Sequence, residues 1–188
     1  MKKNLKIKML SFGWTCSPHV ASVKFALLLL GVCGILLAPQ TGHASWDKKA
    51  NRVVVKKSQR QLVLYHNNDL LKIYSISLGK NPVGHKRYRG DCRTPEGRYV
   101  LDWRNPKSRF FKSIHISYPN AKDRRRAERL GLSPGGNIMI HGLPNKYRTA
   151  PELFEGLDWT DGCIAVTNQD MREIWRLVAD HSVIEIYP

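Results

Sequence analysis

One histidine and one cysteine in the C-terminal half of the chain have the side chains and the surroundings of a catalytic pair. His141 follows the short apolar run 138–140, and Cys163 stands directly before the apolar run 164–166. Two strands that each carry a reactive side chain at one end commonly bring a Cys nucleophile and a His base together. Because a free cysteine is mostly thiol at neutral pH, His141 would either hold Cys163 as a thiolate or take its proton during attack.

Glycines adjoin both members of this pair. Gly142 follows His141, and Gly162 precedes Cys163. Glycine has no Cβ, so the backbone can approach a substrate closely, and N–H groups can point at an oxygen that gains negative charge during attack. We therefore expect the backbone of Gly142, Gly162 and Cys163 to form the oxyanion-binding part of the site.

The order of these residues resembles the signature of a known family, the L,D-transpeptidases with a YkuD-type catalytic domain. That signature is His-Gly, a gap, and then Ser/Thr-x-Gly-Cys, which here reads His141-Gly142 and Thr160-Asp161-Gly162-Cys163. The resemblance reaches upstream to Leu78-Gly79-Lys80 and to the turn Thr94-Pro95-Glu96-Gly97. It therefore covers most of the chain after about residue 50. Papain-like enzymes have the opposite order, with Cys before His.

The resemblance implies a reaction on the stem peptides of peptidoglycan. Cys163 would attack the carbonyl group of the third residue of a tetrapeptide stem, release the terminal D-Ala and form a thioester, with His141 as the base. An amine of a second stem, or of a protein anchored to the wall, would then resolve the thioester. Thr160, Asp161 and Arg93 are the expected substrate-binding residues. The implied reaction needs no metal and no organic cofactor.

The chain departs from the family pattern at three places, which leave the acceptor open. Asp161 stands where many members have His, Ala165 stands where many have Arg or Asn, and 21 residues separate His141 from Cys163. An acid near Cys163 disfavours the thiolate unless a cation or a hydrogen-bond donor neutralises it. The longer insert, which includes Trp159, is expected to form a lid or one wall of the cleft.

Other functions remain open as alternatives. With water as the acceptor, the protein would be a hydrolytic L,D-carboxypeptidase or an amidase on the same substrate. If Cys163 were unreactive, the same domain would be a catalytically silent module that binds the cell wall. An unrelated exported cysteine protease is a third alternative, and it would cleave L-peptides.

The composition is that of one basic domain. A length of 188 residues suffices for a single domain with its own core. Lys and Arg number 31 against 15 Asp and Glu, a formal charge of +16 that predicts attraction to polyanions such as an anionic cell wall. The chain has neither zinc-finger spacing nor the aromatic signature of an RNA-binding domain, so we do not expect nucleic acid as the partner. The partner that the family resemblance implies is peptidoglycan.

Residues 1–44 have the pattern of a signal peptide. Five lysines and no acidic residue accompany the apolar block 25–38, whose 14 residues are fewer than the roughly 20 that span a membrane. The small residues that follow predict cleavage before Ser45, leaving the catalytic domain 45–188 in the periplasm or the cell wall. The alternative is an uncleaved N-terminal anchor, through which alone the protein would contact a membrane.

Cleavage would leave two cysteines, Cys92 and Cys163. Two cysteines in an oxidising compartment often form one disulfide. A Cys92–Cys163 bridge is therefore the structural alternative to a free nucleophile, and it requires the two Cα atoms to lie within about 7 Å of each other.

Alternating and β-branched segments predict a β-rich α+β fold. The expected strands cover residues 52–56, 61–65, 70–78, 98–102, 113–117, 138–140, 164–166 and 182–186. One helix is expected over 121–130 and a second after Thr167, where apolar residues recur at helical spacing: Met171, Ile174, Trp175 and Val178. These elements agree with the fold that the resemblance implies, a mixed β-sandwich-like single domain with one or two helices.

Overall fold

The computed structural model describes residues 48–188, all of which belong to one compact unit. The expected signal peptide 1–44 and the expected cleavage site before Ser45 lie outside the described residues. No helix within the described part of the chain is long and apolar enough to cross a membrane.

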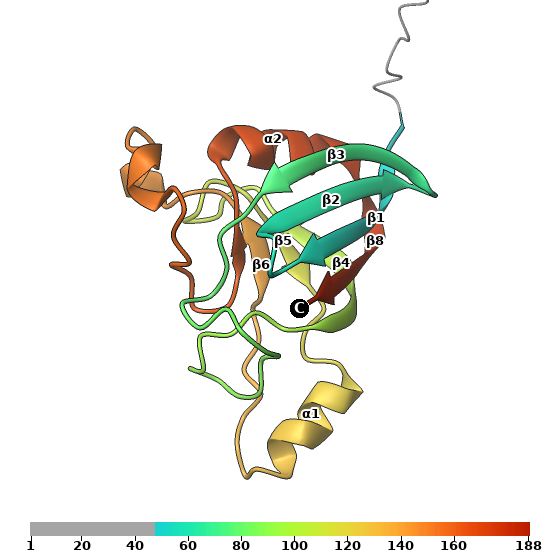
Figure 1. The fold of residues 1–188 in the computed structure, drawn as a ribbon, viewed down its shortest axis with the longest axis vertical. Coiled ribbons are helices and arrows are strands. Elements are labelled where there is room, and N and C mark those ends of the chain that lie inside the picture. The colour runs from blue at the N-terminus through green and yellow to red at the C-terminus, as the bar shows by residue number, and fades with distance from the viewer. Residues whose placement is uncertain (1–47) are drawn as a thin grey trace, which may run out of the picture. The chain divides into compact units, whose positions relative to one another are not determined.

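One mixed sheet of eight strands forms the framework, in the order β3-β2-β1-β8-β4-β5-β6-β7. Figure 1 shows how this sheet curls, with β1, β2, β3 and β8 on one side. The strand bounds are β1 (Ala50–Lys56), β2 (Gln61–His66), β3 (Asp69–Ser75), β4 (Gly97–Asn105), β5 (Ser113–Ile116), β6 (Met139–His141), β7 (Ile164–Ala165) and β8 (Val178–Tyr187). The helices are α1 (Ala121–Glu128) and α2 (Asn168–Leu177), with short 3-10 turns η1 (Asn145–Tyr147) and η2 (Pro151–Phe154). The β-rich α+β, single-domain prediction is therefore confirmed.

The C-terminal strand β8 lies inside the sheet, parallel to β1 and antiparallel to β4. It begins at Val178, four residues before the predicted start at residue 182, because the backbone adopts the extended conformation directly after α2 ends at Leu177. Its alternate side chains Ile184 and Ile186 are buried in the main core cluster. Strand β8 thus joins the N-terminal strands β1–β3 to the strands that carry the site.

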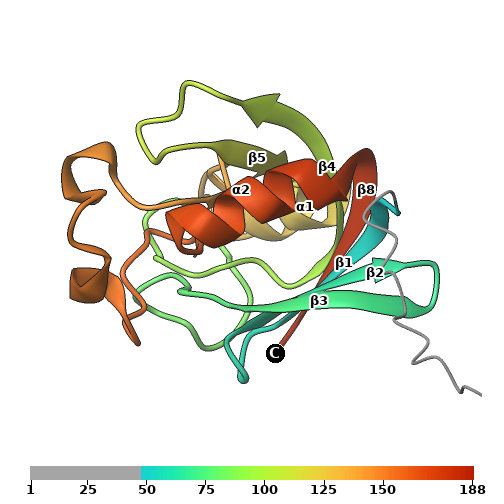
Figure 2. The same cartoon turned by 90° about the horizontal axis from the view of Figure 1, so that it is seen from above.

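Helix α2 connects the two sides of the curled sheet. Thr167 caps its N-terminus by accepting a hydrogen bond from the Asp170 N–H, and the predicted apolar stripe is buried at Met171 and Ile174. On one side the Tyr74 hydroxyl of β3 donates to Glu173, and on the other Arg104 of β4 donates to the backbone of α2. Figure 2 shows α2 between these two groups of strands.

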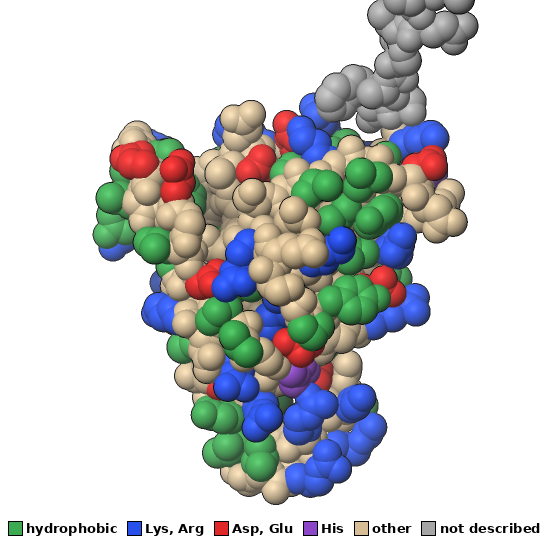
Figure 3. Space-filling view, in the orientation of Figure 1, with side chains coloured by type: hydrophobic (Ala, Val, Ile, Leu, Met, Phe, Trp, Pro, Cys, Tyr) green, Lys and Arg blue, Asp and Glu red, His purple; other side chains and the backbone are tan. Residues whose placement is uncertain are grey.

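Helix α1 is short and strongly basic. Asn120 caps it in a reciprocal pair of hydrogen bonds with Asp123, and it ends at Glu128, two residues before the predicted end at residue 130. Lys and Arg side chains gather over this helix in Figure 3. The connection that follows α1 leads the chain back to β6 and the site.

Candidate active site

Strand pairing brings the histidine and the cysteine together. His141 is the last residue of β6, and it pairs in parallel register with Ala165 of β7, two residues after Cys163. His141 and Cys163 line one cavity of about 580 Å³. The two residues that the sequence nominated are therefore neighbours in space, although 21 residues separate them along the chain.

The His141 imidazole is held in one tautomer. Its Nδ1 lies 2.6 Å from the Gly142 carbonyl oxygen, which can only accept a hydrogen bond, so Nδ1 carries the proton and Nε2 carries the lone pair. The ring packs against Phe110 and Trp159, with centroid separations of 4.6 and 5.6 Å. Burial lowers the pKa of His141 to about 4, so the imidazole is neutral at pH 7 and available as a base.

Cys163 is a free, partly buried thiol. Its Sγ lies 3.7 Å from the Asn137 carbonyl oxygen. Burial raises the pKa of the Cys163 thiol and the Asp161 carboxylate raises it further, while the Met139 N–H and the Lys86 ammonium act in the opposite direction. A raised thiol pKa beside a lowered imidazole pKa means that both groups are neutral at pH 7. Two neutral groups are compatible with the second of the two roles considered above, in which His141 takes the thiol proton during attack.

A turn between Thr160 and Cys163 fixes the position of the cysteine. The buried Thr160 hydroxyl donates to the Cys163 carbonyl at 2.8 Å and accepts from the Gly162 N–H at 3.1 Å. The Thr94 hydroxyl, from the Thr94-Pro95-Glu96-Gly97 turn, also donates to the Cys163 carbonyl, at 3.5 Å. Thr160 was expected to bind substrate, but its hydroxyl is occupied in holding this turn.

The backbone amides of the two expected oxyanion glycines are also occupied. The Gly142 N–H donates to the Phe110 carbonyl at 3.1 Å, and the Gly162 N–H donates to Thr160. By contrast, the Cys163 N–H makes no hydrogen bond within residues 48–188. In this conformation the Cys163 amide is therefore the one of these three that is available to an oxyanion.

Gly162 has a steric reason to be glycine. Its φ is +125°, and a Cβ at this position would lie 2.6 Å from the Arg93 carbonyl oxygen. A backbone oxygen cannot swing out of the way, so no residue with a side chain fits without moving the turn.

Asp161 extends into solvent beside Cys163 and forms an ion pair. Its Oδ1 lies 2.9 Å from Lys80 Nζ. Lys80 is thus a cation that offsets the acid next to Cys163. The offset is partial, because Asp161 still contributes to the raised pKa of the thiol.

Arg93 does not reach the site. Its side chain lines neither of the two cavities that include Cys163. The guanidinium group instead lies against Gly84, since Nη1 is 3.2 Å from the place where a Cβ on that glycine would be. In this structure the Arg93 side chain therefore lies outside both cavities, and what Arg93 places near Cys163 is its carbonyl oxygen beside Gly162.

Cys92 and Cys163 are both free thiols, so the alternative disulfide is not formed. Both line a second cavity of about 660 Å³ that continues from the nucleophile toward Arg89 and Gly135. The Cys92 sulfur lies 3.9 Å from Asp161 Oδ1.

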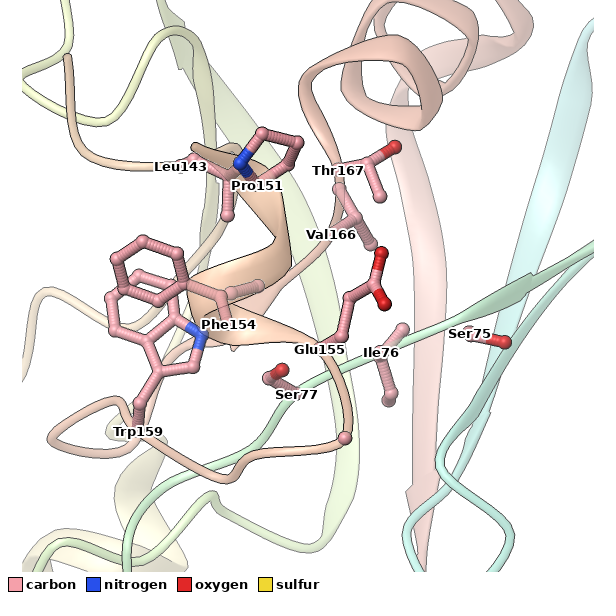
Figure 4. A pocket seen from close by; sticks show the side chains of 12 residues that line it. Ser75, Ile76, Ser77, Leu143, Pro151, Phe154, Glu155, Trp159, Val166 and Thr167 are labelled. Carbon is pink, nitrogen blue, oxygen red and sulfur yellow. The ribbon is translucent and has the colours of Figure 1, made fainter. Parts of the chain in front are cut away.

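The insert between His141 and Cys163 forms a wall of the cleft. Trp159 lines the cavity of His141 and Cys163, and its ring packs on Phe154 of η2 at 4.8 Å. On its other side Trp159 lines a separate apolar cavity of about 300 Å³, together with Ala165. Figure 4 shows the Phe154 and Trp159 rings against each other at the edge of this cavity.

The sequence reasoning missed several neighbours of the pair. Phe110, Asn137 and Met139 line the cavity, and of these only Met139 stood in a segment already connected with the site. Phe110 and Asn137 lie in loops, where no periodicity reveals which side chains face inward. Within residues 48–188 there is no group of three or more His, Cys, Asp or Glu that could hold a metal ion.

Residues 50–186 match the family model described as the L,D-transpeptidase catalytic domain, YkuD. The chain belongs to this family. It is 32% identical over 150 residues to the Escherichia coli K12 protein named "Putative L,D-transpeptidase YafK", with 72% of this chain and 53% of that protein covered. The protein of the same name in Escherichia coli O157:H7 matches with the same identity and coverage. The chain spans about half the length of these curated relatives.

Two solved structures support the fold of the family. The helical cell shape determining protein Pgp2 of Campylobacter jejuni superimposes with a TM-score of 0.55 at 23% identity, covering 74% of this chain and 48% of that one. Bd1075 of Bdellovibrio bacteriovorus superimposes with a TM-score of 0.53 at 23% identity and the same coverage. At this identity the likeness concerns the fold alone.

Proposed function

We propose that the protein is an exported, cysteine-dependent peptidoglycan L,D-transpeptidase, with Cys163 as its nucleophile and His141 as its base. One observation carries the proposal. The two side chains line a single cavity, and the Gly142 carbonyl orients the imidazole so that Nε2 is free to accept a proton. Membership of the family supplies the reaction class.

The geometry supports a complete acyl-transfer sequence. Nε2 of His141 takes the Sγ proton as Cys163 attacks the carbonyl carbon of the third stem residue, and the Cys163 N–H donates to the oxyanion. The intermediate then collapses, the bond to D-Ala breaks, and the imidazolium protonates the leaving amine. This leaves a thioester on Cys163 and a neutral imidazole. An incoming amine loses its proton to His141, attacks the thioester and regenerates the thiol.

The charge of the cavity suits an acidic substrate. Lys107 and Arg109 line it together with the catalytic pair. Their cationic groups would attract the carboxylates of a stem peptide, and the positive charge of the whole chain would favour encounter with an anionic wall.

The test is product analysis on a disaccharide-tetrapeptide from peptidoglycan. The purified protein should release D-Ala and form crosslinked dimers, both of which mass spectrometry detects. Cys163→Ala should form neither product, whereas Cys92→Ala, which removes the other free thiol, should form both. Dimer formation by Cys163→Ala would disprove the assignment of the nucleophile.

The same experiment identifies the acceptor. Tripeptide without dimers would assign water as the acceptor and would make the protein a hydrolytic L,D-carboxypeptidase. When a purified wall protein is added to this assay, its use as the amine donor would appear as a stem tripeptide attached to one of its lysines. Export is tested separately by fractionating cells and measuring the N-terminus of the mature chain, for which cleavage before Ser45 is expected.

A further inference from the structure

A large aromatic side chain stands exposed in the catalytic cavity without a role in the reaction described above. Trp103 of β4 retains 44% of its accessible surface. It lines the same cavity as Cys163 and His141. Single exposed apolar side chains are common on protein surfaces, but this one lies inside the cavity of the proposed catalytic pair, where a bound substrate could cover it.

The Trp103 ring is supported from one side. It stacks on His115 of β5, with a centroid separation of 5.0 Å and an interplanar angle of 19°. His115 is itself fixed, because its Nδ1 lies 2.6 Å from Asp102 Oδ1. The His115 imidazole therefore covers one face of the Trp103 indole and holds the ring in place. The exposed area of Trp103 belongs to the remainder of the ring. Such an arrangement provides a flat, preorganised surface.

This surface is connected to the nucleophile through the sheet. His115 pairs with Met139 of β6, whose N–H interacts with the Cys163 thiol. Beside the indole, the loop after β4 adds hydrogen-bonding groups to the same cavity: Asn105, Lys107, Ser108 and Arg109. A flat aromatic surface with polar and cationic groups along one side is therefore continuous with the catalytic pair.

A pyranose ring has the complementary chemistry. Its axial C–H groups form an apolar face that stacks on an aromatic ring, while its hydroxyl and acetamido groups project sideways to hydrogen-bonding partners. An aminosugar that bears an acidic substituent would also meet the cations of Lys107 and Arg109. The extended peptide part of the substrate has no comparable flat apolar face.

We propose that Trp103 is the platform of a glycan subsite, on which an aminosugar ring of the strand that bears the stem peptide stacks while Cys163 attacks the peptide. The proposal rests on the proposed function, because it places the sugar relative to that reaction. Trp103 would thereby make the enzyme prefer stems still attached to glycan over free stem peptides.

The test compares two substrates that differ only in the sugar. For each protein, kcat/KM is measured with a disaccharide-tetrapeptide and with the free tetrapeptide. Wild type should prefer the disaccharide form by roughly 2- to 10-fold, the range of an aromatic stacking contact. Trp103→Ala should bring the ratio close to one, and Trp103→Phe should retain most of the preference. Tyr187→Ala, which removes an exposed aromatic ring outside the cavity, is the matched control and should keep the wild-type ratio.

The outcomes separate this proposal from the proposed function. If both substrates are processed but Trp103→Ala keeps the wild-type ratio, the glycan subsite is disproved while the transpeptidase stands. If wild type processes neither substrate, the proposed function fails, and calorimetric titration with the peptide-free disaccharide decides about the subsite. Binding that is lost in Trp103→Ala and kept in Tyr187→Ala supports the subsite, and absence of binding to wild type overturns it.

Discussion

Cys163 and His141, the proposed catalytic pair, are a neutral thiol and a neutral imidazole that line the same cavity. Burial is the first cause for both residues, since it disfavours the charged form of each and so raises the pKa of Cys163 and lowers the pKa of His141. The Gly142 carbonyl acts against burial at the imidazole but does not overcome it. In the proposed reaction, proton transfer is therefore coupled to attack on the substrate, because both groups start in their neutral forms.

The lowered pKa of His141 predicts a loss of stability in mild acid. In the unfolded chain a histidine has a pKa of roughly 6.5, whereas in the folded protein the pKa of His141 is about 4. Between these values the unfolded state binds a proton that the folded state does not, so the free energy of unfolding falls as the pH decreases. From pH 7 to pH 5 this contribution should amount to about 2 kcal/mol.

Denaturant unfolding of wild type and His141→Gln at pH 7 and pH 5 measures this contribution. Other groups titrate in the same range. The contribution of His141 is therefore the decrease in the free energy of unfolding from pH 7 to pH 5 in wild type minus the same decrease in His141→Gln. His181→Gln, at an exposed histidine, should lose as much stability as wild type. Equal losses in wild type and His141→Gln would show that His141 is not held neutral by burial.

At the scale of elements, the turn from Thr160 to Cys163 determines where the Cys163 thiol lies. Two threonine hydroxyls, from Thr160 and Thr94, converge on the Cys163 carbonyl. The Thr94 hydroxyl also accepts from the Gly79 N–H, so three distant segments meet at this point. Position 162 must be glycine for them to pack this closely.

Gly162→Ala should therefore destabilise the protein and abolish turnover. The new Cβ would lie 2.6 Å from the Arg93 carbonyl oxygen, at a φ of +125° that side-chain-bearing residues rarely adopt. Backbone strain of this kind costs about 1–3 kcal/mol, before the clash is counted. Thermal unfolding and the D-Ala release assay provide the two measurements.

The matched control is Gly131→Ala, because Gly131 also has positive φ (+68°) but has no atom within 4 Å of an added Cβ. It should lose about 1 kcal/mol and keep its activity. If Gly162→Ala and Gly131→Ala behave alike, close packing against Arg93 is not what requires glycine at position 162.

At the scale of the whole molecule, β8 holds the two halves of the sheet together. It pairs with β1 on one side and with β4 on the other, so in the strand order of the sheet β8 stands between the strands β1–β3 and the strands β4–β7. Ile184 stands opposite Val53 in one pairing and opposite Tyr99 in the other, and its side chain is fully buried.

Ile184→Ala should lower the free energy of unfolding by about 2–5 kcal/mol, the range for truncating a buried isoleucine. Chemical denaturation followed by tryptophan fluorescence measures the change. Tyr187→Ala, at a half-exposed position of the same strand, should change stability by no more than about 0.5 kcal/mol. Comparable effects at positions 184 and 187 would mean that β8 is not part of the cooperative core.

Local patterns in the sequence were sufficient for the framework and the reactive pair. The β-branched run at 52–56 and the helical stripe through Met171 and Ile174 became β1 and α2, because side-chain periodicity follows directly from backbone geometry. His141 and Cys163 were recognisable because their flanking glycines and apolar runs are local features. The ends of elements were less accurate, as the early start of β8 at Val178 shows.

What the sequence by itself determined is the class of fold and the family signature, and it supplied the prediction that His141 and Cys163 act as a pair. The tertiary structure alone decided that the amides of Gly142 and Gly162 are occupied, that Arg93 points away, and that Trp103 opens into the cavity. The physical reason is that each of these facts depends on atoms far apart in the chain. Residue type and spacing limit what a side chain or an N–H can do, but only the packed fold assigns its partner.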